Sequence, residues 1–253
     1  MKTLRALLAI AVLAIAVLAG GAHAQDITGT ITIKKRLTRR NVTAPVSIYQ
    51  RGTVVSLGKD SGEDPLAFEL THVVIYLEGP ASAGVQPTKD AKLPAFTMEQ
   101  LDRRFTPDLL VVPTGAAISF PNMDPIFHNV FSLSKPKSFD LGSYDKGQTR
   151  TVTFPRSGLV FVYCRLHPNM EATILVTPNR WYARPDASGQ YRIADVPPGK
   201  YTVVAWHKAA GYFRKQIVIE PGHGASADFF IPIDVDTDKP TAEASSMNMT
   251  EGR

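Results

Sequence analysis

The chain has 253 residues, of which 44% are apolar and 20% are charged, and its formal net charge is +5. This apolar content is enough to bury hydrophobic cores in one large or two small domains. The basic excess is too small to predict nucleic-acid binding, which needs a dense cluster of Lys and Arg.

The first 24 residues have the pattern of a secretory signal peptide. Lys2 and Arg5 precede an unbroken apolar run over residues 6–19, and small residues at positions 22 and 24 predict cleavage after Ala24. Removal of this segment takes away two of the 28 basic residues and none of the 23 acidic ones, so the mature charge is 26 minus 23, or +3. We therefore expect an exported protein without a membrane span, the alternative being an uncleaved anchor.

After this segment, short β-branched and aromatic runs alternate with Gly, Pro, Asn and Asp, which indicates an all-β fold. The predicted strands are residues 27–33, 46–49, 72–77, 109–112, 117–120, 129–133, 149–154, 160–163, 172–176, 189–193, 199–207, 214–219 and 227–231. Residues 79–94 and 177–186 contain several prolines and are interpreted as linkers. The polar tail, residues 234–253, is predicted to be disordered.

Cys164 is the single cysteine of the chain. An exported protein meets an oxidising compartment, where a lone exposed thiol is oxidised or pairs with another molecule. This thiol is therefore predicted to be buried and inert, or else protected by a bound metal. The neighbouring residues favour a metal, because His167 and Met170 follow closely and His128 stands 36 residues earlier.

One thiolate, two imidazoles and one thioether form a ligand set that suits copper cycling between Cu(I) and Cu(II). Zinc is the competing metal, but it prefers Cys, His and carboxylate ligands. Glu171 is the nearest carboxylate, and its place beside Met170 on a predicted strand should turn it to the opposite face. The sequence thus favours a single copper ion with four ligands: His128, Cys164, His167 and Met170.

These residues carry a resemblance to a known family. His128-Asn129 with Cys164-x-x-His167-Pro168-x-Met170 resembles the cupredoxins, and the short ligand loop is most similar to that of the amicyanins. The likeness spans residues 96–176. It implies a Greek-key β-sandwich with one type 1 (blue) copper ion at one end, and an electron path through the edge of His167.

The resemblance also implies a role for Asn129, the residue after the first histidine ligand. In the cupredoxins this position helps to hold the ligand loop by hydrogen bonding, which makes Asn129 a supporting residue of the copper site. An ordinary polar residue at the start of a strand is the alternative.

Two turn motifs follow the copper segment. The patterns D-x-x-G-x-Y at residues 186–191 and V-P-P-G-x-Y at residues 196–201 resemble the carboxypeptidase regulatory-like, or transthyretin-like, β-sandwich. Physically they are tight turns, in which Gly189 and Gly199 can adopt conformations that are costly for other residues.

The strands that usually open such a module, residues 29–33 and 73–77, precede the copper segment. We therefore expect a discontinuous sandwich of residues 26–90 and 178–233, into which a cupredoxin domain of residues 91–177 is inserted. Two domains in series are the alternative. Cupredoxins fused to this module resemble a group of bacterial periplasmic proteins, which implies a periplasmic location.

The chain is predicted to carry single electrons between a protein donor and a protein acceptor, and not to be an enzyme. It has no His-x-His pair for the extra coppers of a multicopper oxidase, and four protein ligands leave the metal no open position for substrate. A non-redox copper carrier or buffer, and a binding module with a vestigial copper site, are the alternatives. His72 and His207 are interpreted as structural residues.

Overall fold

The computed structural model describes residues 24–37, 65–79 and 94–232. Within these ranges the chain folds almost wholly into β-strands, with one short helix, α2 (Pro65–Leu70), so the predicted all-β class is confirmed. The predicted signal peptide up to residue 23, the predicted strand 46–49, most of the predicted linker 79–94 and the polar tail lie outside the described residues. No helix in the described ranges has the length and apolar character needed to cross a bilayer.

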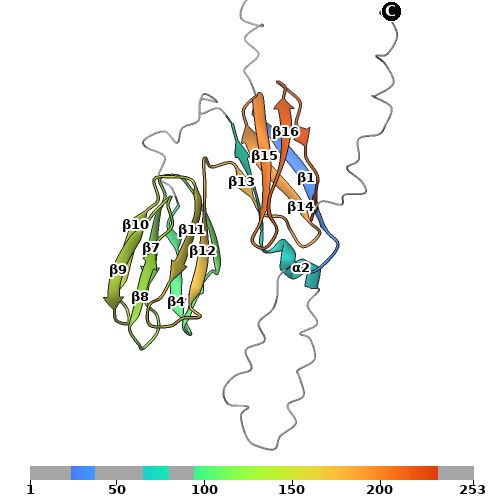
Figure 1. The fold of residues 1–253 in the computed structure, drawn as a ribbon. Coiled ribbons are helices and arrows are strands. Elements are labelled where there is room, and N and C mark those ends of the chain that lie inside the picture. Colours follow the sequence, from blue (N-terminus) through green and yellow to red (C-terminus); the bar gives the residue numbers. More distant parts are fainter. Residues whose placement is uncertain (1–23, 38–64, 80–93, 233–253) are drawn as a thin grey trace, which may run out of the picture.

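The middle of the chain forms a β-sandwich, here called the central sandwich, which is the green body in Figure 1. One sheet has the strand order β10-β7-β3 and the other has the order β6-β12-β11-β8-β9, while β4 and β5 form a hairpin. The bounds are β3 Phe96–Thr97, β4 Glu99–Leu101, β5 Arg104–Thr106, β6 Leu109–Pro113, β7 Ala117–Pro121, β8 His128–Ser132, β9 Phe139–Tyr144, β10 Thr149–Thr153, β11 Gly158–Tyr163 and β12 Glu171–Thr177. Phe120, Phe154 and Val160 are among the side chains that fill its core.

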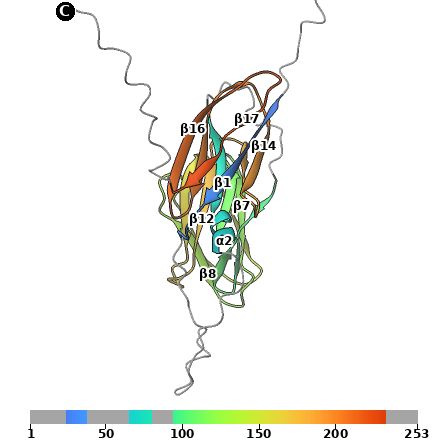
Figure 2. The ribbon, with the colours of Figure 1, turned by 90° about the vertical axis from the view of Figure 1, so that its right-hand side faces the viewer.

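Strands from both ends of the described chain form a second body, here called the flanking sandwich. One sheet has the order β14-β1-β17, with β18 also paired to β1, and the other has the order β13-β2-β15-β16. The bounds are β1 Gln25–Ile33, β2 Val73–Glu78, β13 Tyr182–Ala183, β14 Gln190–Val196, β15 Gly199–His207, β16 Gly211–Ile219, β17 Ala225–Ser226 and β18 Phe229–Ile231. Figure 2 shows this body in front of the central sandwich.

Strands that precede the central sandwich in the chain pair with strands that follow it. β1 pairs with β14, and β2 pairs with β15, each in antiparallel register. Such pairing is what an insertion requires, because a sandwich built in series would not combine the two ends of the chain. The division into domains at the residue boundaries given above stays a prediction.

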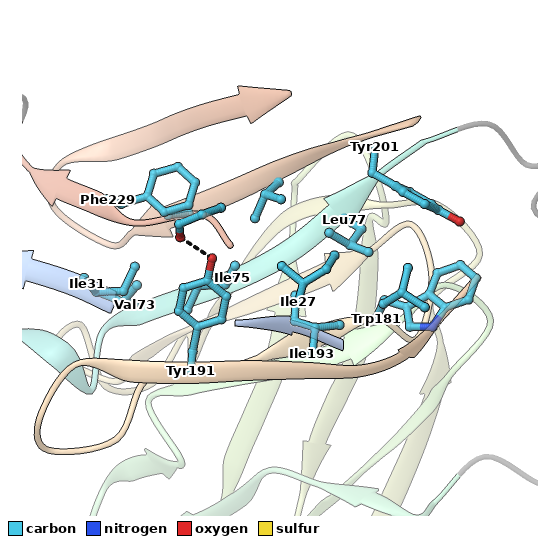
Figure 3. Close-up of a cluster of buried hydrophobic side chains, with 14 of the residues drawn as sticks. Ile27, Ile31, Val73, Ile75, Leu77, Trp181, Tyr191, Ile193, Tyr201 and Phe229 are labelled. Carbon is cyan, nitrogen blue, oxygen red and sulfur yellow. Dashed lines mark hydrogen bonds between the residues drawn. The ribbon is translucent and has the colours of Figure 1, made fainter. Parts of the chain in front are cut away.

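Alternating burial along the strands builds the core of the flanking sandwich. On β14, Tyr191, Ile193 and Val196 are buried, while the residues between them are exposed. Figure 3 shows Tyr191 and Ile193 among side chains from β1 and β2. The Tyr191 hydroxyl donates a hydrogen bond to the Ala227 carbonyl, so burial of this phenol leaves no polar group unpaired.

The interpretation of residues 177–186 as a linker is wrong. Trp181 is buried in the core of the flanking sandwich, and β13 pairs with β2. The indole nitrogen of Trp181 donates to the Asp195 carbonyl at 3.2 Å, which satisfies its single donor. The prolines at both ends of the segment obscure a short strand whose aromatic residues supply packing.

The two turn glycines differ from each other. Gly189 has a φ of +84°, in the left-handed region that favours glycine, as predicted. Gly199 is not among the residues with a positive φ, so the expectation of a costly conformation there is wrong. A Cβ atom at Gly199 would lie 3.2 Å from a ring carbon of Tyr201, and glycine is therefore favoured by the close approach of that ring.

An apolar seam joins the two sandwiches. It consists of Val74, Tyr76, Leu109, Val111, Leu175, Val204 and Trp206. The strands at the seam bury both faces. On β15, for example, Val203 lies in the core of the flanking sandwich, whereas Val204 lies in the seam. Burial on both faces explains why β2, β12 and β15 appear in the sequence as continuous apolar runs.

A polar cluster at the edge of the seam also links the two bodies. Asp108, which precedes β6, accepts hydrogen bonds from His72 Nε2 at 3.4 Å and from Lys208 Nζ at 3.2 Å. The hydrogen bond to Asp108 is the largest cause of the raised pKa of His72, and the same bond is the largest cause of the lowered pKa of Asp108. A histidine whose pKa is raised by folding stabilises the fold at low pH, and this stabilisation is lost as the pH rises through the folded pKa.

We expect Asp108→Asn to lower the free energy of unfolding by about 1 kcal/mol near pH 5 and by less near pH 8.5, because the charge of His72 that Asp108 stabilises is lost as the pH rises. Urea unfolding at the two pH values measures the difference. Asp145→Asn, at an exposed aspartate on the central sandwich, is the control. An equal loss at both pH values would contradict the contribution of His72.

Candidate metal centre

His128, Cys164 and His167 come together at one end of the central sandwich. His128 is the first residue of β8, Cys164 directly follows β11, and His167 lies in the loop between β11 and β12. β11 and β8 are neighbours in the sheet, and Tyr163 pairs with Phe131, which brings Cys164 to the start of β8. The three ligand atoms all lie within 4.8 Å of one another.

The distances from the sulfur to the two nitrogens fit metal binding. Cys164 Sγ lies 3.9 Å from His128 Nδ1 and 3.7 Å from His167 Nδ1. For comparison, a metal about 2.0 Å from an imidazole nitrogen and about 2.3 Å from a thiolate, with about 120° between the two bonds, separates these atoms by about 3.7 Å. The two sulfur–nitrogen distances are therefore compatible with a metal bound by the thiolate together with either imidazole.

His128 is fully buried. Its ring is oriented by a hydrogen bond at Nε2, the nitrogen that does not face Cys164. Its Nε2 lies 2.7 Å from Asp124 Oδ2. A carboxylate can only accept, so the hydrogen of His128 resides on Nε2, and Nδ1 is left as the free lone pair beside Cys164. Burial acts to raise the pKa of Asp124, but hydrogen bonds from the Arg103 amide, His128 and the Asp102 amide outweigh it and lower this pKa.

The loop from Cys164 to Met170 is closed by its own backbone. The Cys164 amide donates to the Met170 carbonyl at 3.1 Å, and the Met170 amide donates to the His167 carbonyl at 3.0 Å. Met170 is 1% exposed and belongs to the same buried cluster as Cys164. The residue predicted as the weak axial ligand therefore lies in the same buried cluster as the thiol and not at the surface.

His167 is half-buried and reaches the edge of the site. Burial is the largest cause that lowers the pKa of His167, and electrostatic repulsion by His128 and Arg103 adds to it. At neutral pH the imidazole is therefore unprotonated, which is the form that binds a metal.

Asn129 contacts the site in two ways. Its amide nitrogen donates to Cys164 Sγ at 3.5 Å, and its side-chain Nδ2 donates to Asp140 Oδ1 at 2.7 Å. The other carboxylate oxygen of Asp140 pairs with Arg165 of the ligand loop at 3.0 Å. Asn129 is thus connected to the ligand loop through Asp140, an intermediate that the sequence did not predict.

Asp124 and Asp140 are the two residues that sequence reasoning missed. A signal for the first existed, because metal-binding histidines usually donate their second nitrogen to a carboxylate or carbonyl. Asp124 is the nearest carboxylate before His128. Asp140 had no such signal, since its strand β9 contains Gly142 and Ser143 and was not predicted.

The carboxylate that would favour zinc is absent from the cluster. Among the described residues, the group of close ligand atoms contains two histidines and a cysteine, without Asp or Glu. Glu171 is exposed whereas Met170 is buried, in agreement with the predicted alternation. The described cluster thus offers one thiolate and two imidazoles, donors that suit copper.

Comparison with solved structures finds copper proteins. An amicyanin variant in the Cu(I) form is 20% identical over 32% of this chain and 81% of its own length, with a TM-score of 0.31. A purple cupredoxin from Nitrosopumilus maritimus is 20% identical over 32% of this chain and 99% of its own length, with a TM-score of 0.30. A copper-containing nitrite reductase from Thermus scotoductus SA-01 is 22% identical over 36% of this chain and 24% of its own length, with a TM-score of 0.33. No protein family and no curated protein matches the chain.

Proposed function

We propose that this chain is a periplasmic type 1 copper protein that carries single electrons between two protein partners. The observation that carries the proposal is the convergence of His128, Cys164 and His167, whose ligand atoms lie within 4.8 Å of one another at a largely buried position. A thiolate with two imidazoles and a weak axial sulfur is the donor set of blue-copper electron-transfer sites. Met170 is the proposed axial ligand, and four protein ligands leave no position for an enzymatic substrate.

The protein holds the donor groups in place before any metal binds. Asp124 fixes the His128 ring, the Asn129 amide donates to Cys164 Sγ, and two backbone hydrogen bonds close the ligand loop. Bound copper supplies the one-electron couple between Cu(I) and Cu(II). Because these contacts restrain the ligands on the protein side, little rearrangement is needed when the charge of the site changes, and a small rearrangement favours fast electron transfer.

His167 offers the electron a route to the surface. Exposed apolar side chains lie on the chain segments around it, namely Leu101, Met123, Phe127 and Leu166, with exposures between 42% and 56%. The Met123 amide donates to the Gln100 carbonyl, so the segments that carry Leu101 and Met123 are neighbours. An exposed apolar patch of this kind is typical of a transient protein interface. We propose that the redox partners dock there.

The copper form of the purified protein tests this function. We expect an intense visible band with one copper per chain, a reversible one-electron couple and rapid electron self-exchange. Slow self-exchange, or release of copper on reduction, would instead identify a non-redox copper carrier. Protein that takes up no copper would show that the site is vestigial. Fractionation of the expressing cells, with detection in the periplasm, tests the proposed location.

A further inference from the structure

Asp124 lies between a proposed copper ligand and a backbone turn. Its Oδ2 accepts from His128 Nε2 at 2.7 Å and from the Arg103 amide at 2.9 Å, and its Oδ1 accepts from the Asp102 amide at 2.7 Å. The Asp124 residue is 5% exposed. Three donors therefore surround one buried carboxylate, and this arrangement keeps its negative charge beside His128.

The turn that supplies two of these donors has an unusual backbone. Asp102 and Arg103 have φ values of 54° and 57°, in the left-handed region that non-glycine residues seldom adopt. Two successive residues in this conformation direct their amides toward the same carboxylate, as in a backbone anion site. The β4–β5 hairpin thus binds an internal anion, the side chain of Asp124.

The loop that carries Asp124 is fixed from its other side as well. The Asp124 amide donates to Asn122 Oδ1 at 2.9 Å, and Asn122 Nδ2 donates to the carbonyls of Ile126 and Tyr144. Asn122 is itself fully buried. The loop that carries the carboxylate is therefore held by hydrogen bonds on both sides.

We propose that Asp124 is a positioning residue that lowers the reduction potential of the copper, an inference that rests on the proposed function. Through Nε2–H it orients His128 and increases the electron density of the ring. It also keeps one negative charge a single imidazole away from the metal, in a buried environment where charges are poorly screened. Both effects favour Cu(II) over Cu(I).

Asp124→Asn removes the charge and keeps the size of the side chain. At a fixed ambient potential we expect the ratio of Cu(II) to Cu(I) to fall about tenfold, an upward shift of about 59 mV for a one-electron couple. Asp102→Asn is the matched control, because it removes an exposed carboxylate from the same turn and leaves the backbone amide that donates to Asp124. Its potential should stay close to that of the wild type, since exposed charges are screened by salt.

A second measurement needs no copper. In the metal-free wild type, nitrogen NMR of the histidine ring should show His128 protonated on Nε2, and in Asp124→Asn this preference should weaken. Asp124→Glu keeps the charge, so its reduction potential should lie nearer to that of the wild type than the potential of Asp124→Asn does. If Asp124→Asn does not fold, the potential of Asp124→Glu is compared with that of the wild type instead.

The outcomes separate this inference from the proposed function. If wild-type protein binds no copper, the proposed function fails, and the NMR result still decides whether Asp124 holds His128. If copper binds normally and Asp124→Asn has an unchanged potential, or one shifted no further than that of Asp102→Asn, the role of Asp124 is overturned.

Discussion

Replacement of Cys164 by serine is expected to abolish the intense visible band of the copper form. That band requires charge transfer from a thiolate to Cu(II), and a serine hydroxyl stays protonated near neutral pH and is a poor ligand for copper. The fold should survive with a loss of about 1 kcal/mol, because the substitution changes one buried atom at the end of the central sandwich. Absorption spectra with copper analysis measure the first effect, and thermal unfolding measures the second.

Met170→Leu is the matched control for this experiment. Leucine has nearly the volume of methionine and should be tolerated at this buried position at a cost below about 1.5 kcal/mol. Because the axial sulfur is only a weak ligand, the variant should keep the visible band while its reduction potential changes. Survival of the band in Cys164→Ser would refute the ligand assignment.

Much of the fold could be predicted because short sequence patterns indicate strands and turns. The alternating burial of β14 and the turn around Gly189 are both visible in the sequence and both occur in the structure. The seam could not be predicted in the same way. Val204 and Trp206 have the apolar character of core residues, and nothing in the sequence states that their partners are Leu109 and Leu175 of another sandwich.

At the candidate site, too, some features follow from the sequence pattern, whereas others depend on the backbone conformation. The proposed ligands could be predicted because their chemical types and spacing form one set, and the structure brings three of them within 4.8 Å. The hydrogen bonds that hold the proposed ligands in place depend on loop conformation. Asp124 accepts from the amides of Asp102 and Arg103, and both residues have left-handed backbone angles, which are uncommon for residues other than glycine. A spacing pattern carries no information on such a turn.

The histidines away from the site were interpreted as structural, and His207 allows the sharpest test of that interpretation. His207 and Glu69 are both fully buried, and Nε2 of His207 lies 3.1 Å from Glu69 Oε2. Its Nδ1 accepts from the amides of Ala209 and Ala210, each at 3.1 Å. His207 is therefore neutral with its hydrogen on Nε2, and burial is the largest cause of its lowered pKa.

We expect His207→Ala to lower the free energy of unfolding by about 3 kcal/mol at neutral pH, because it leaves a buried carboxylate and two amides without this partner. The lowered pKa means that the unfolded chain takes up a proton first as the pH falls below about 6.5. The stabilisation by neutral His207 is therefore complete above that pH and is lost as the pH falls toward the folded pKa. The difference between wild type and variant should accordingly shrink near pH 5.

Urea unfolding at both pH values measures this difference. His223→Ala is the control, because His223 is exposed and its ring nitrogen contacts the Pro221 carbonyl, and its expected loss is below about 0.5 kcal/mol. The paired replacement of His207 and Glu69 by leucine should cost less than His207→Ala, because it removes the buried charge together with its partner. If His207→Ala were no more harmful than His223→Ala, the junction between α2 and β15 would depend on apolar packing and not on the hydrogen bond from His207 to Glu69.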